Sequence, residues 1–377
     1  MGVLVSAPAA TIQRSGTHEV AMKHMLLVAL LLSPACVRTS PAQPQPFDNP
    51  TTTETDQTVP SIPVVEAGPT RAINNRDYLL AALDAIDAAQ DHIRVAQYLL
   101  YDDTPVDALL QHLTDAAERG VLVQVLADEE GSETEAILTD LANQNIQTQL
   151  DTKNTTLHNK LIVADDVVVV GSHNLTDAAM DRNHEGSVLV NDPEVAGWYA
   201  SWFDAMWIDP TPDPEPEPWT RTDLVPIADR MITQALLSCI EQATEDIELL
   251  MYAIAYDADY PDSDVDRLLT ALEDAHESGI EVQVVVDGSF WILDNHVNDA
   301  AIERLDDAGI SLWRTPASVT SHAKVLRCDD TVIISDANWS YSGLELMHGT
   351  SLQATTNDLS AAYRSWMQTI RDDADVL

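Results

Sequence analysis

Two segments of this sequence carry a histidine, a lysine, an aspartate and an asparagine at identical intervals. The first set is His158, Lys160, Asp165 and Asn174, and the second is His322, Lys324, Asp329 and Asn338. A single His-x-Lys is typical of a solvated strand face, but two matched sets indicate a shared chemical task. The chain has only four lysines, and two of them lie in these sets. Holding a compact ammonium against a phosphate oxygen is a task that suits lysine better than arginine.

A β-hairpin is expected to position the first set. Residues 161–170 are mostly β-branched and are interrupted by a turn-like pair of aspartates. Because strand side chains alternate, His158 and Lys160 share one face. Folding the hairpin about its first aspartate places His158 opposite Ser172, so that Ser172 and Asn174 join the same face. We therefore expect four polar side chains to converge beside an apolar hairpin.

With these motifs the sequence resembles the phospholipase D superfamily, which is defined by two H-x-K-x4-D motifs and a following G-S-x-N-like segment. The resemblance covers most of the chain from about Tyr78 to the end. It implies an α/β fold with two phospholipase D-like α/β repeats, mixed sheets flanked by helices, packed as a pseudo-two-fold bilobal unit. It also implies that the repeats meet at one active site that uses no metal and no cofactor.

The first copy matches the family pattern closely, and the second departs from it at two positions. Residues 171–174 are Gly-Ser-His-Asn, and Glu185 supplies a carboxylate shortly after them. In the second copy Asp336 stands where the first has Ser172, and Gly349 stands where the first has Glu185. The two half-sites are therefore not equivalent in detail.

The resemblance implies a phosphodiester substrate, whose cleavage needs a nucleophile, a proton donor for the leaving alcohol, and cations for the nonbridging oxygens. We expect His158, oriented by Glu185, to attack and form a phosphohistidine, as the family resemblance also implies. We expect His322 to donate the proton, because Asp336, predicted to lie across the strands from it, would stabilise its imidazolium. The remaining polar residues of the motifs are expected to hold the oxygens: Lys160, Lys324, Asn174, Asn338 and Ser172.

For two motif aspartates and for the histidines outside the motifs, a structural role is the alternative to a catalytic one. Asp165 and Asp329 belong to the catalytic motifs, but both lie at predicted hairpin turns, where hydrogen bonding to turn amides is the more ordinary role. The other histidines, such as His173, His184 and His348, are expected to be structural or exposed, because no ligand cluster for a metal is evident around them.

The pattern outside the motifs also repeats. Helical spacing at 78–90 precedes a strand-like run at 93–100, and a second amphipathic helix is expected at 106–119. The same order returns in the second half, where residues 275–284 correspond to residues 116–125. We therefore expect repeat 1 at 71–208, an extended Pro-rich linker at 209–221 and repeat 2 at 222–377.

The formal net charge of the chain is −43, with acidic residues spread over the whole folded-looking region. Such a surface repels nucleic acid and anionic membrane alike at low salt. Clusters of Arg and Lys that would line a nucleic-acid groove are absent from the sequence. Self-repulsion also destabilises a compact state unless ions screen it. A salty external medium is the simplest explanation.

The N-terminus has the composition of an export signal. An apolar run at 25–32 precedes Ser-Pro-Ala-Cys, which resembles a bacterial lipoprotein signal with Cys36 as the lipidated residue. Ordinary cleavage after Ala35 is the alternative. We expect a signal segment at 1–36, a disordered tether at 37–70, and a membrane-anchored lipoprotein on the extracytoplasmic side, or otherwise a secreted or periplasmic protein.

The remaining cysteines, Cys239 and Cys328, both lie in the second half. In an exported protein they would form a disulfide if their geometry allows, and two buried thiols are the alternative.

Phe290 and Trp291 give the strongest indication of the substrate. After the strand ending at Asp128 the first half continues with polar residues, but after Asp287 the second half continues toward Phe290, Trp291, Ile292 and Leu293. Loops at this end of a sheet commonly line α/β active sites, so we expect these residues to contact an acyl chain or a membrane interface. The alternative is that they open a helix whose face is buried.

The sequence predicts a phospholipase D-type phosphodiesterase that hydrolyses phospholipid head groups, with transphosphatidylation as a related outcome. A metal-independent nuclease of the same superfamily is the alternative. A phosphatidyltransferase resembling cardiolipin synthase and an inactive binding protein are less favoured, the latter because both His-Lys pairs are intact.

Overall fold

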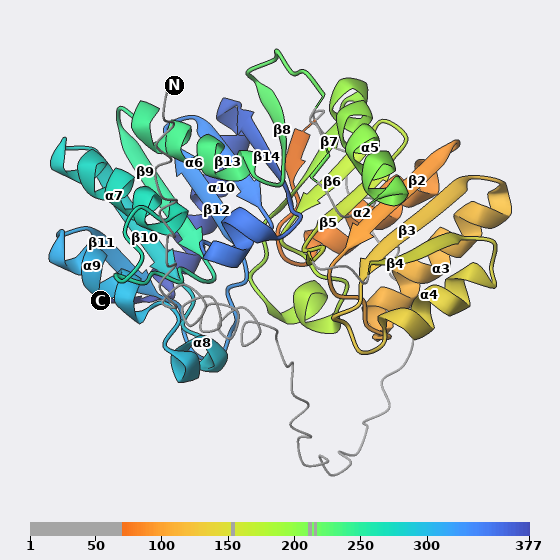
Figure 1. The fold of residues 1–377 in the computed structure, drawn as a ribbon, viewed down its shortest axis with the longest axis horizontal. Coiled ribbons are helices and arrows are strands. Elements are labelled where there is room, and N and C mark those ends of the chain that lie inside the picture. Colours follow the sequence, from red (N-terminus) through yellow and green to blue (C-terminus); the bar gives the residue numbers. More distant parts are fainter. Residues whose placement is uncertain (1–69, 152–154, 210–212, 215–216) are drawn as a thin grey trace, which may run out of the picture. The chain divides into compact units, whose positions relative to one another are not determined.

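Two twisted sheets, one from each half of the chain, form the framework of the computed structural model (Figure 1). The structure describes residues 70–377 except 152–154, 210–212 and 215–216. The expected signal segment, the lipidation at Cys36 and the tether up to residue 69 lie outside the described residues. Among the helices that the structure describes, none combines the length and the apolar composition that a membrane span requires.

The first sheet has the strand order β1-β7-β6-β5-β2-β3-β4. Strands β2, β3 and β4 are parallel, and β5, β6, β7 and β1 continue the sheet in antiparallel fashion. The bounds are β1 Thr70–Ala72, β2 His92–Gln97, β3 Leu122–Asp128, β4 Gln147–Asp151, β5 Lys160–Ala164, β6 Val167–Gly171 and β7 Ser187–Asn191.

The second sheet repeats this plan in the order β15-β11-β10-β9-β12-β13-β14-β8. Its parallel strands are β9, β10 and β11, and its hairpin strands are β12 and β13. The bounds are β8 Leu224–Ala228, β9 Asp246–Met251, β10 Glu281–Val286, β11 Ser311–Arg314, β12 Lys324–Cys328, β13 Thr331–Ser335, β14 Thr350–Thr355 and β15 Asp375–Val376. The expected pair of mixed-sheet repeats is confirmed.

Helices flank both sheets (Figure 1). In the first half they are α2 Asp77–Ala88, α3 Thr104–Arg119, α4 Thr134–Ala142 and α5 Pro193–Ile208, with the π-helical turn η1 at Ala178–Arg182. In the second half they are α6 Met231–Gln242, α7 Asp264–Glu277, α8 Phe290–Asn295, α9 Asp299–Asp307 and α10 Asn357–Asp372, with η2 at Ser342–Leu346. Helix α3 ends where predicted, because Gly120 takes a left-handed conformation with φ of 97°.

Three hydrophobic clusters hold these layers together. One lies under α2, α3 and α4 of the first repeat, and another lies under α6, α7 and α9 of the second. The third joins the repeats, because residues of α5 such as Trp202 and residues of α10 such as Tyr363 share it with strands of both sheets. The two halves therefore share a core rather than folding as separate bodies.

Contacts fasten the described part of the linker to this body. The indole of Trp198 in α5 donates to the carbonyl of Glu217 at 3.0 Å, and the indole of Trp219 donates to the carbonyl of Leu224 at 2.8 Å. The linker is therefore anchored at these residues, because its tryptophan has an apolar core to pack against.

Cys239 of α6 and Cys328 of β12 form a disulfide, with Cα atoms 5.8 Å apart. The bond ties α6 to the last residue of β12, the strand that begins with Lys324.

Candidate active site

The two motif histidines, His158 and His322, lie where the two repeats meet, and each is held there by the opposite repeat. The backbone N–H of His158 donates to the carbonyl of His348 at 2.8 Å, and that of His322 donates to the carbonyl of His184 at 2.8 Å. Only 13% of the His322 side chain is exposed, and His158 is buried. The predicted single site built from both halves therefore has a direct backbone basis.

The hairpins hold the two lysines beside these histidines. Lys160 and Lys324 begin β5 and β12, and each ammonium donates to the carbonyl of the motif histidine two residues earlier, at 2.5 Å. The first hairpin is shifted by one residue from the predicted register, because Ala164 pairs with Val167 across a two-residue turn. Ser172 is therefore not directly opposite His158 in the hairpin register, and its hydroxyl bonds to Glu185 instead.

Two tyrosines, which the sequence analysis missed, cover the histidines and lysines. The ring of Tyr98 lies 4.6 Å from that of His158, and the ring of Tyr252 lies 4.8 Å from that of His322. Each ring centroid also lies 5.0 Å from the ammonium of the lysine in the same repeat. Their signal in the sequence is a tyrosine directly after corresponding strands, β2 and β9.

Glu185 pairs with the second histidine, so the prediction that it orients His158 is wrong. Its Oε2 accepts a hydrogen bond from the Ser172 hydroxyl at 2.5 Å and lies 2.9 Å from Nδ1 of His322. Its Oε1 accepts from the Asn183 amide at 3.0 Å. The carboxylate is wholly buried among these groups.

Asp336 belongs to the environment of His158, so its predicted pairing with His322 is also wrong. The His158 ring is hydrogen-bonded to the backbone of Asp336, and the Asp336 carboxylate interacts with Lys160. Its Oδ2 accepts from the Thr350 amide at 2.6 Å. A Cβ on Gly349 would approach Oδ1 of Asp336 to 2.6 Å, so the glycine makes room for this carboxylate.

The physical reason for both corrections is the pseudo-two-fold packing of the repeats. Counting residues across the strands of one hairpin assigns a carboxylate to the histidine of the same repeat. When two repeats face each other, the carboxylate of one repeat reaches the histidine of the other, as Glu185 reaches His322.

Burial sets the charges of this cluster. The pKa of His158 lies well below its ordinary value because of desolvation and the nearby Lys160 and Lys324. Desolvation also lowers the pKa of His322, but there Glu185 opposes the shift. The pKa of Glu185 is lowered to about 2 although desolvation raises it, because His322 and its hydrogen bond stabilise the carboxylate.

The lysines and Asp336 are shifted in the directions that desolvation dictates. Burial lowers the pKa of Lys160 to about 8 and that of Lys324 well below its ordinary value, with Asp336 and Glu185 opposing both shifts. Burial raises the pKa of Asp336 to about 7, against the effect of Lys160. A bound phosphate would raise the pKa of both lysines again, since a nearby anion favours the protonated form of an amine.

Asp165 and Asp329 hold the framework instead of contacting the reacting groups. The carboxylate of Asp165 accepts from the amides of residues 90–92, and that of Asp329 accepts from the amides of residues 244–246. Each aspartate lies at the end of its hairpin strand remote from the lysine. We therefore assign both to structure, and their inclusion among the catalytic residues is corrected.

Asp128 and Asp287 are two further positioning carboxylates that the sequence analysis did not identify. Asp128 accepts from the amide of Leu157 at 2.8 Å, and Asp287 accepts from the amide of Ser321 at 2.5 Å. Each donor directly precedes a catalytic histidine. Burial raises the pKa of Asp128 to about 7 and that of Asp287 to about 6. The sequence signal for this shared role is their matching position, since Asp128 ends β3 and Asp287 directly follows β10.

Asn174 and Asn338 occupy equivalent places in the two repeats. Each is followed by a residue that forms an isolated bridge to the segment after β2 or β9, namely Leu175 with Leu100 and Trp339 with Ile254. The side-chain Oδ1 of each asparagine is buried and has no hydrogen-bond partner among the described residues. An unpartnered Oδ1 is open to a donor from a ligand, whereas holding a phosphate oxygen would need the N–H groups of the same amides.

The apolar segment 290–293 lies in and just after the start of helix α8, and it is partly exposed and partly buried in the core. Phe290 is 67% exposed, whereas Ile292 is 2% exposed and packs inside. Trp291 is stacked on Tyr252 with ring centroids 6.2 Å apart, and Tyr252 in turn covers His322. An apolar surface thus begins in solvent and ends at a catalytic histidine.

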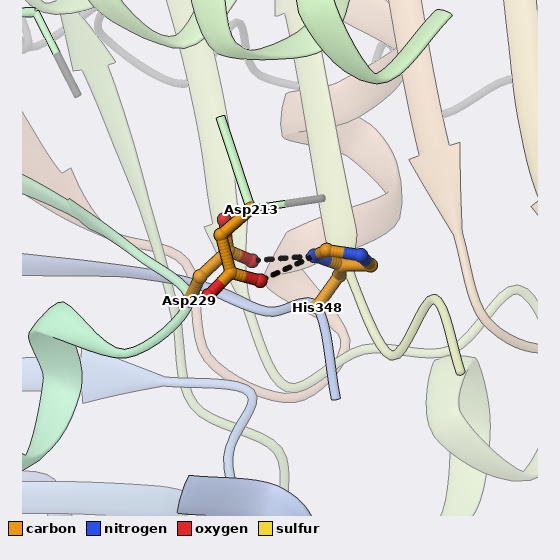
Figure 2. A group of neighbouring side chains, drawn as sticks. All are labelled: Asp213, Asp229 and His348. Atoms are coloured by element: carbon orange, nitrogen blue, oxygen red, sulfur yellow. Dashed lines mark hydrogen bonds and ion pairs between the residues drawn. The ribbon is translucent and has the colours of Figure 1, made fainter. Parts of the chain in front are cut away.

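His348 has the neighbours of a metal ligand, contrary to the expectation from sequence (Figure 2). Its Nδ1 lies 3.0 Å from a carboxylate oxygen of Asp229 and 3.5 Å from one of Asp213. The sequence did not reveal this group because the three residues lie in separate segments, 135 positions apart at the extremes (348 minus 213). His173 is structural as expected, since it stacks on Tyr78 and its ring contacts Ser187.

Comparison with known proteins agrees with this architecture. The family model described as "Cardiolipin synthase, PLD-like domain" matches residues 82–207 and 236–371. A protein named phospholipase D from Rickettsia bellii (strain RML369-C) is 34% identical over 118 residues, which are 31% of this chain and 57% of that protein. The chain thus spans little more than half the length of this relative.

Two solved structures share the fold. The phosphatidylserine synthase of Haemophilus influenzae Rd KW20 has a TM-score of 0.65 at 12% identity, over 82% of this chain and 88% of that one. The polyphosphate kinase of Porphyromonas gingivalis has a TM-score of 0.59 at 15% identity, over 86% of this chain and 51% of that one. The family match covers both repeats and both histidine-lysine motifs, and the chain therefore belongs to the phospholipase D superfamily, whose members include phosphodiesterases and synthases.

Proposed function

We propose that this protein is a phosphodiesterase that hydrolyses phospholipid head groups through a phosphohistidine on His158. The neutral imidazole of His158 attacks phosphorus, so that a P–N bond forms and the bond to the leaving alcohol breaks. The neutral form is favoured there because the pKa of His158 is far below its ordinary value.

His322 supplies the proton that the leaving alcohol needs. Its Nδ1 is engaged by Glu185, which leaves Nε2 for proton transfer, and the ionised Glu185 stabilises the imidazolium. In the second step His322 takes a proton from water, the water oxygen attacks phosphorus, and the P–N bond breaks. An alcohol in place of water would give transphosphatidylation.

The lysines stabilise the charge on the nonbridging oxygens. Lys160 and Lys324 come from opposite repeats and interact electrostatically across the site, so a phosphate between them would contact both ammoniums. The side-chain N–H groups of Asn174 and Asn338 would supply further donors, whereas the Ser172 hydroxyl is committed to Glu185 and the prediction that it holds a phosphate oxygen is not supported.

The observation that carries the lipid assignment is the aromatic path from α8 to the site. Phe290 is exposed, Trp291 is half-buried on Tyr252, and Tyr252 covers His322. An exposed aromatic next to a half-buried tryptophan suits the interface of a lipid aggregate. The net charge of −43 repels nucleic acid, and it repels anionic lipid as well, so it favours a phospholipid aggregate without net negative charge.

The test compares hydrolysis of phospholipid vesicles with hydrolysis of a short soluble phosphodiester. Phe290→Ser combined with Trp291→Ala should lower the rate on vesicles by roughly 10-fold or more, because about 1.4 kcal/mol of apolar contact with the aggregate is lost. The rate on the soluble diester should change little. Ile292 is left in place because it is part of the core.

Leu80→Ser is the matched control, since Leu80 is 69% exposed on α2. This variant should behave like the wild type on both substrates. Equal losses on vesicles and soluble diester in the α8 variant, or cleavage of single-stranded DNA faster than of either lipid substrate, would contradict the lipid assignment. Adding ethanol to the vesicle assay measures transfer beside hydrolysis.

We also propose that the protein acts outside the cytoplasm, anchored at a membrane through Cys36. The Cys239–Cys328 disulfide supports export, because such bonds persist in oxidising compartments. Metabolic labelling with a radioactive fatty acid should mark the wild type and not Cys36→Ala. An unlabelled wild type found free in the medium would favour simple secretion.

A further inference from the structure

Two carboxylates and a buried imidazole converge beside the linker between the repeats (Figure 2). Asp213 belongs to the linker, Asp229 follows β8, and His348 lies between η2 and β14. One oxygen of each aspartate and Nδ1 of His348 all lie within 4.8 Å of one another. None of the three side chains has a role in the chemistry proposed above.

The spacing of these atoms suits a shared metal ion. Donor atoms bound at about 2.1 Å around one ion lie roughly 3.0 to 3.4 Å apart for octahedral to tetrahedral angles. The observed separations from Nδ1 of His348 are 3.0 Å to Asp229 and 3.5 Å to Asp213. A small movement of the Asp213 side chain would complete the geometry.

Two of the three side chains are buried and the third is partly exposed, as expected for a metal site that is open to solvent on one side. The side chain of His348 is 0% exposed and that of Asp229 is 6% exposed, whereas that of Asp213 is 39% exposed. An ion or a water ligand could therefore enter beside Asp213. The second oxygen of Asp229 accepts from the indole of Trp202 at 2.9 Å, an outer contact of the kind that orients ligating carboxylates.

The kind of ion follows from the donors. An imidazole with two carboxylates is typical of zinc and neighbouring transition metals, whereas calcium and magnesium prefer oxygen ligands alone. Arg230 donates to Oδ1 of Asp213 at 3.1 Å, the same oxygen that faces His348, and places one positive charge beside the group. That charge weakens attraction of a dication, but the net charge of −43 on the whole chain acts in the opposite direction.

We propose that Asp213, Asp229 and His348 bind a zinc-like divalent transition-metal ion that fastens the linker to the second repeat. The backbone of His348 also accepts the N–H of His158, so the ion would stabilise the segment against which the first catalytic strand is aligned. The same contacts also suit an Nδ1–H of His348 that donates to the two carboxylates without a metal. The experiment separates these two states.

The full-length protein is first dialysed against a chelator and then titrated with Zn²⁺ by calorimetry and with Co²⁺ by visible absorption. The wild type should bind one tight ion per chain, show ligand-field bands with Co²⁺, and melt at a higher temperature with Zn²⁺. Asp213→Asn should weaken the binding by roughly 10-fold or more. This variant changes an exposed residue, so its fold is not at risk.

Glu217→Gln is the matched control, because it removes another exposed carboxylate of the same linker. It should bind Zn²⁺ and Co²⁺ as the wild type does. If Asp213→Asn binds as tightly as the wild type, the ions are held by the acidic surface in general and the site is refuted. A wild type that binds no tight ion is equally a refutation and leaves hydrogen bonding from Nδ1–H of His348 as the explanation.

Discussion

At the residue scale, the same burial that lowers the pKa of both catalytic histidines leaves them with different tasks. Burial and two nearby ammoniums hold the pKa of His158 well below its ordinary value, which favours the neutral form that the proposed nucleophile needs. His322 has Glu185 on Nδ1, which offsets part of the desolvation and favours a transferable proton. In the proposed mechanism, the contact of Glu185 with His322 is therefore what distinguishes the acid from the nucleophile.

The lysines lead to a prediction about anion binding and pH. Burial lowers the pKa of Lys160 to about 8, and the charged form of an amine exists below its pKa. Sulfate, whose charge is constant over this range, should therefore bind well at neutral pH and lose affinity as the pH rises through about 8. A free lysine would lose its charge only near 10.4.

Calorimetric titration with sulfate at a series of pH values measures this effect. Lys160→Gln should bind sulfate more weakly at neutral pH and with a flatter dependence on pH, because the titrating cation is gone. A wild-type affinity that stays constant up to about pH 10 would show that Lys160 keeps the ordinary pKa of a lysine.

The sequence predicted which histidines and lysines gather at the candidate site but not which carboxylate lies beside which histidine. Paired intervals identified His158, Lys160, His322 and Lys324 because the spacing along a strand is local information. The contact between Glu185 and His322 joins residues 137 positions apart in different repeats. No local pattern encodes that distance.

At the element scale, two strand ends align the catalytic hairpins. Asp128 at the end of β3 and Asp287 after β10 each accept the amide that precedes a catalytic histidine. The strands were predicted within a few residues, because their apolar runs are clear. The hairpin register was off by one, since a turn of two residues and one of three have similar composition, and this error put Ser172 opposite the wrong residue.

The role of Asp128 can be measured by substitution. Asp128→Ala removes both acceptors, leaves the Leu157 amide unpaired, and should lower kcat by roughly 10-fold with little change in KM. Asp128→Asn keeps one oxygen acceptor and should recover much of this loss.

Glu129→Gln is the control, because Glu129 is exposed next to Asp128. It should leave kcat unchanged. A drop in melting temperature for Asp128→Ala with unchanged kcat per folded molecule would mean that Asp128 only stabilises the fold.

At the scale of the whole molecule, repulsion between negative charges lowers the stability of the fold and the shared hydrophobic core raises it. A chain with a net charge of −43 repels itself, while the hydrophobic cluster between the sheets holds both repeats together. The duplication was visible in the sequence, but the shared core was not, because helices α5 and α10 pack on strands of both repeats only after folding.

Salt should therefore stabilise this protein more than it stabilises a neutral one. The screening length falls from about 10 Å at 0.1 M salt to about 3 Å at 1 M, which removes most repulsion between surface carboxylates. We expect the melting temperature to rise by roughly 5 °C or more over this range, which corresponds to a gain of a few kcal/mol in the free energy of unfolding. Thermal scans in NaCl measure this, with sucrose at matched water activity as the control. An equal rise in sucrose would attribute the effect to solvent exclusion instead.

The central claim is that the two repeats divide one reaction, with His158 as nucleophile and His322 as proton donor. The most direct measurement is mass spectrometry of enzyme that is rapidly quenched during turnover under conditions that preserve phosphohistidine. The wild type and His322→Ala should both carry an acid-labile phosphoryl adduct on His158, and His158→Ala should carry none. An adduct on His322 of the wild type, with His158 unmodified, would contradict the account.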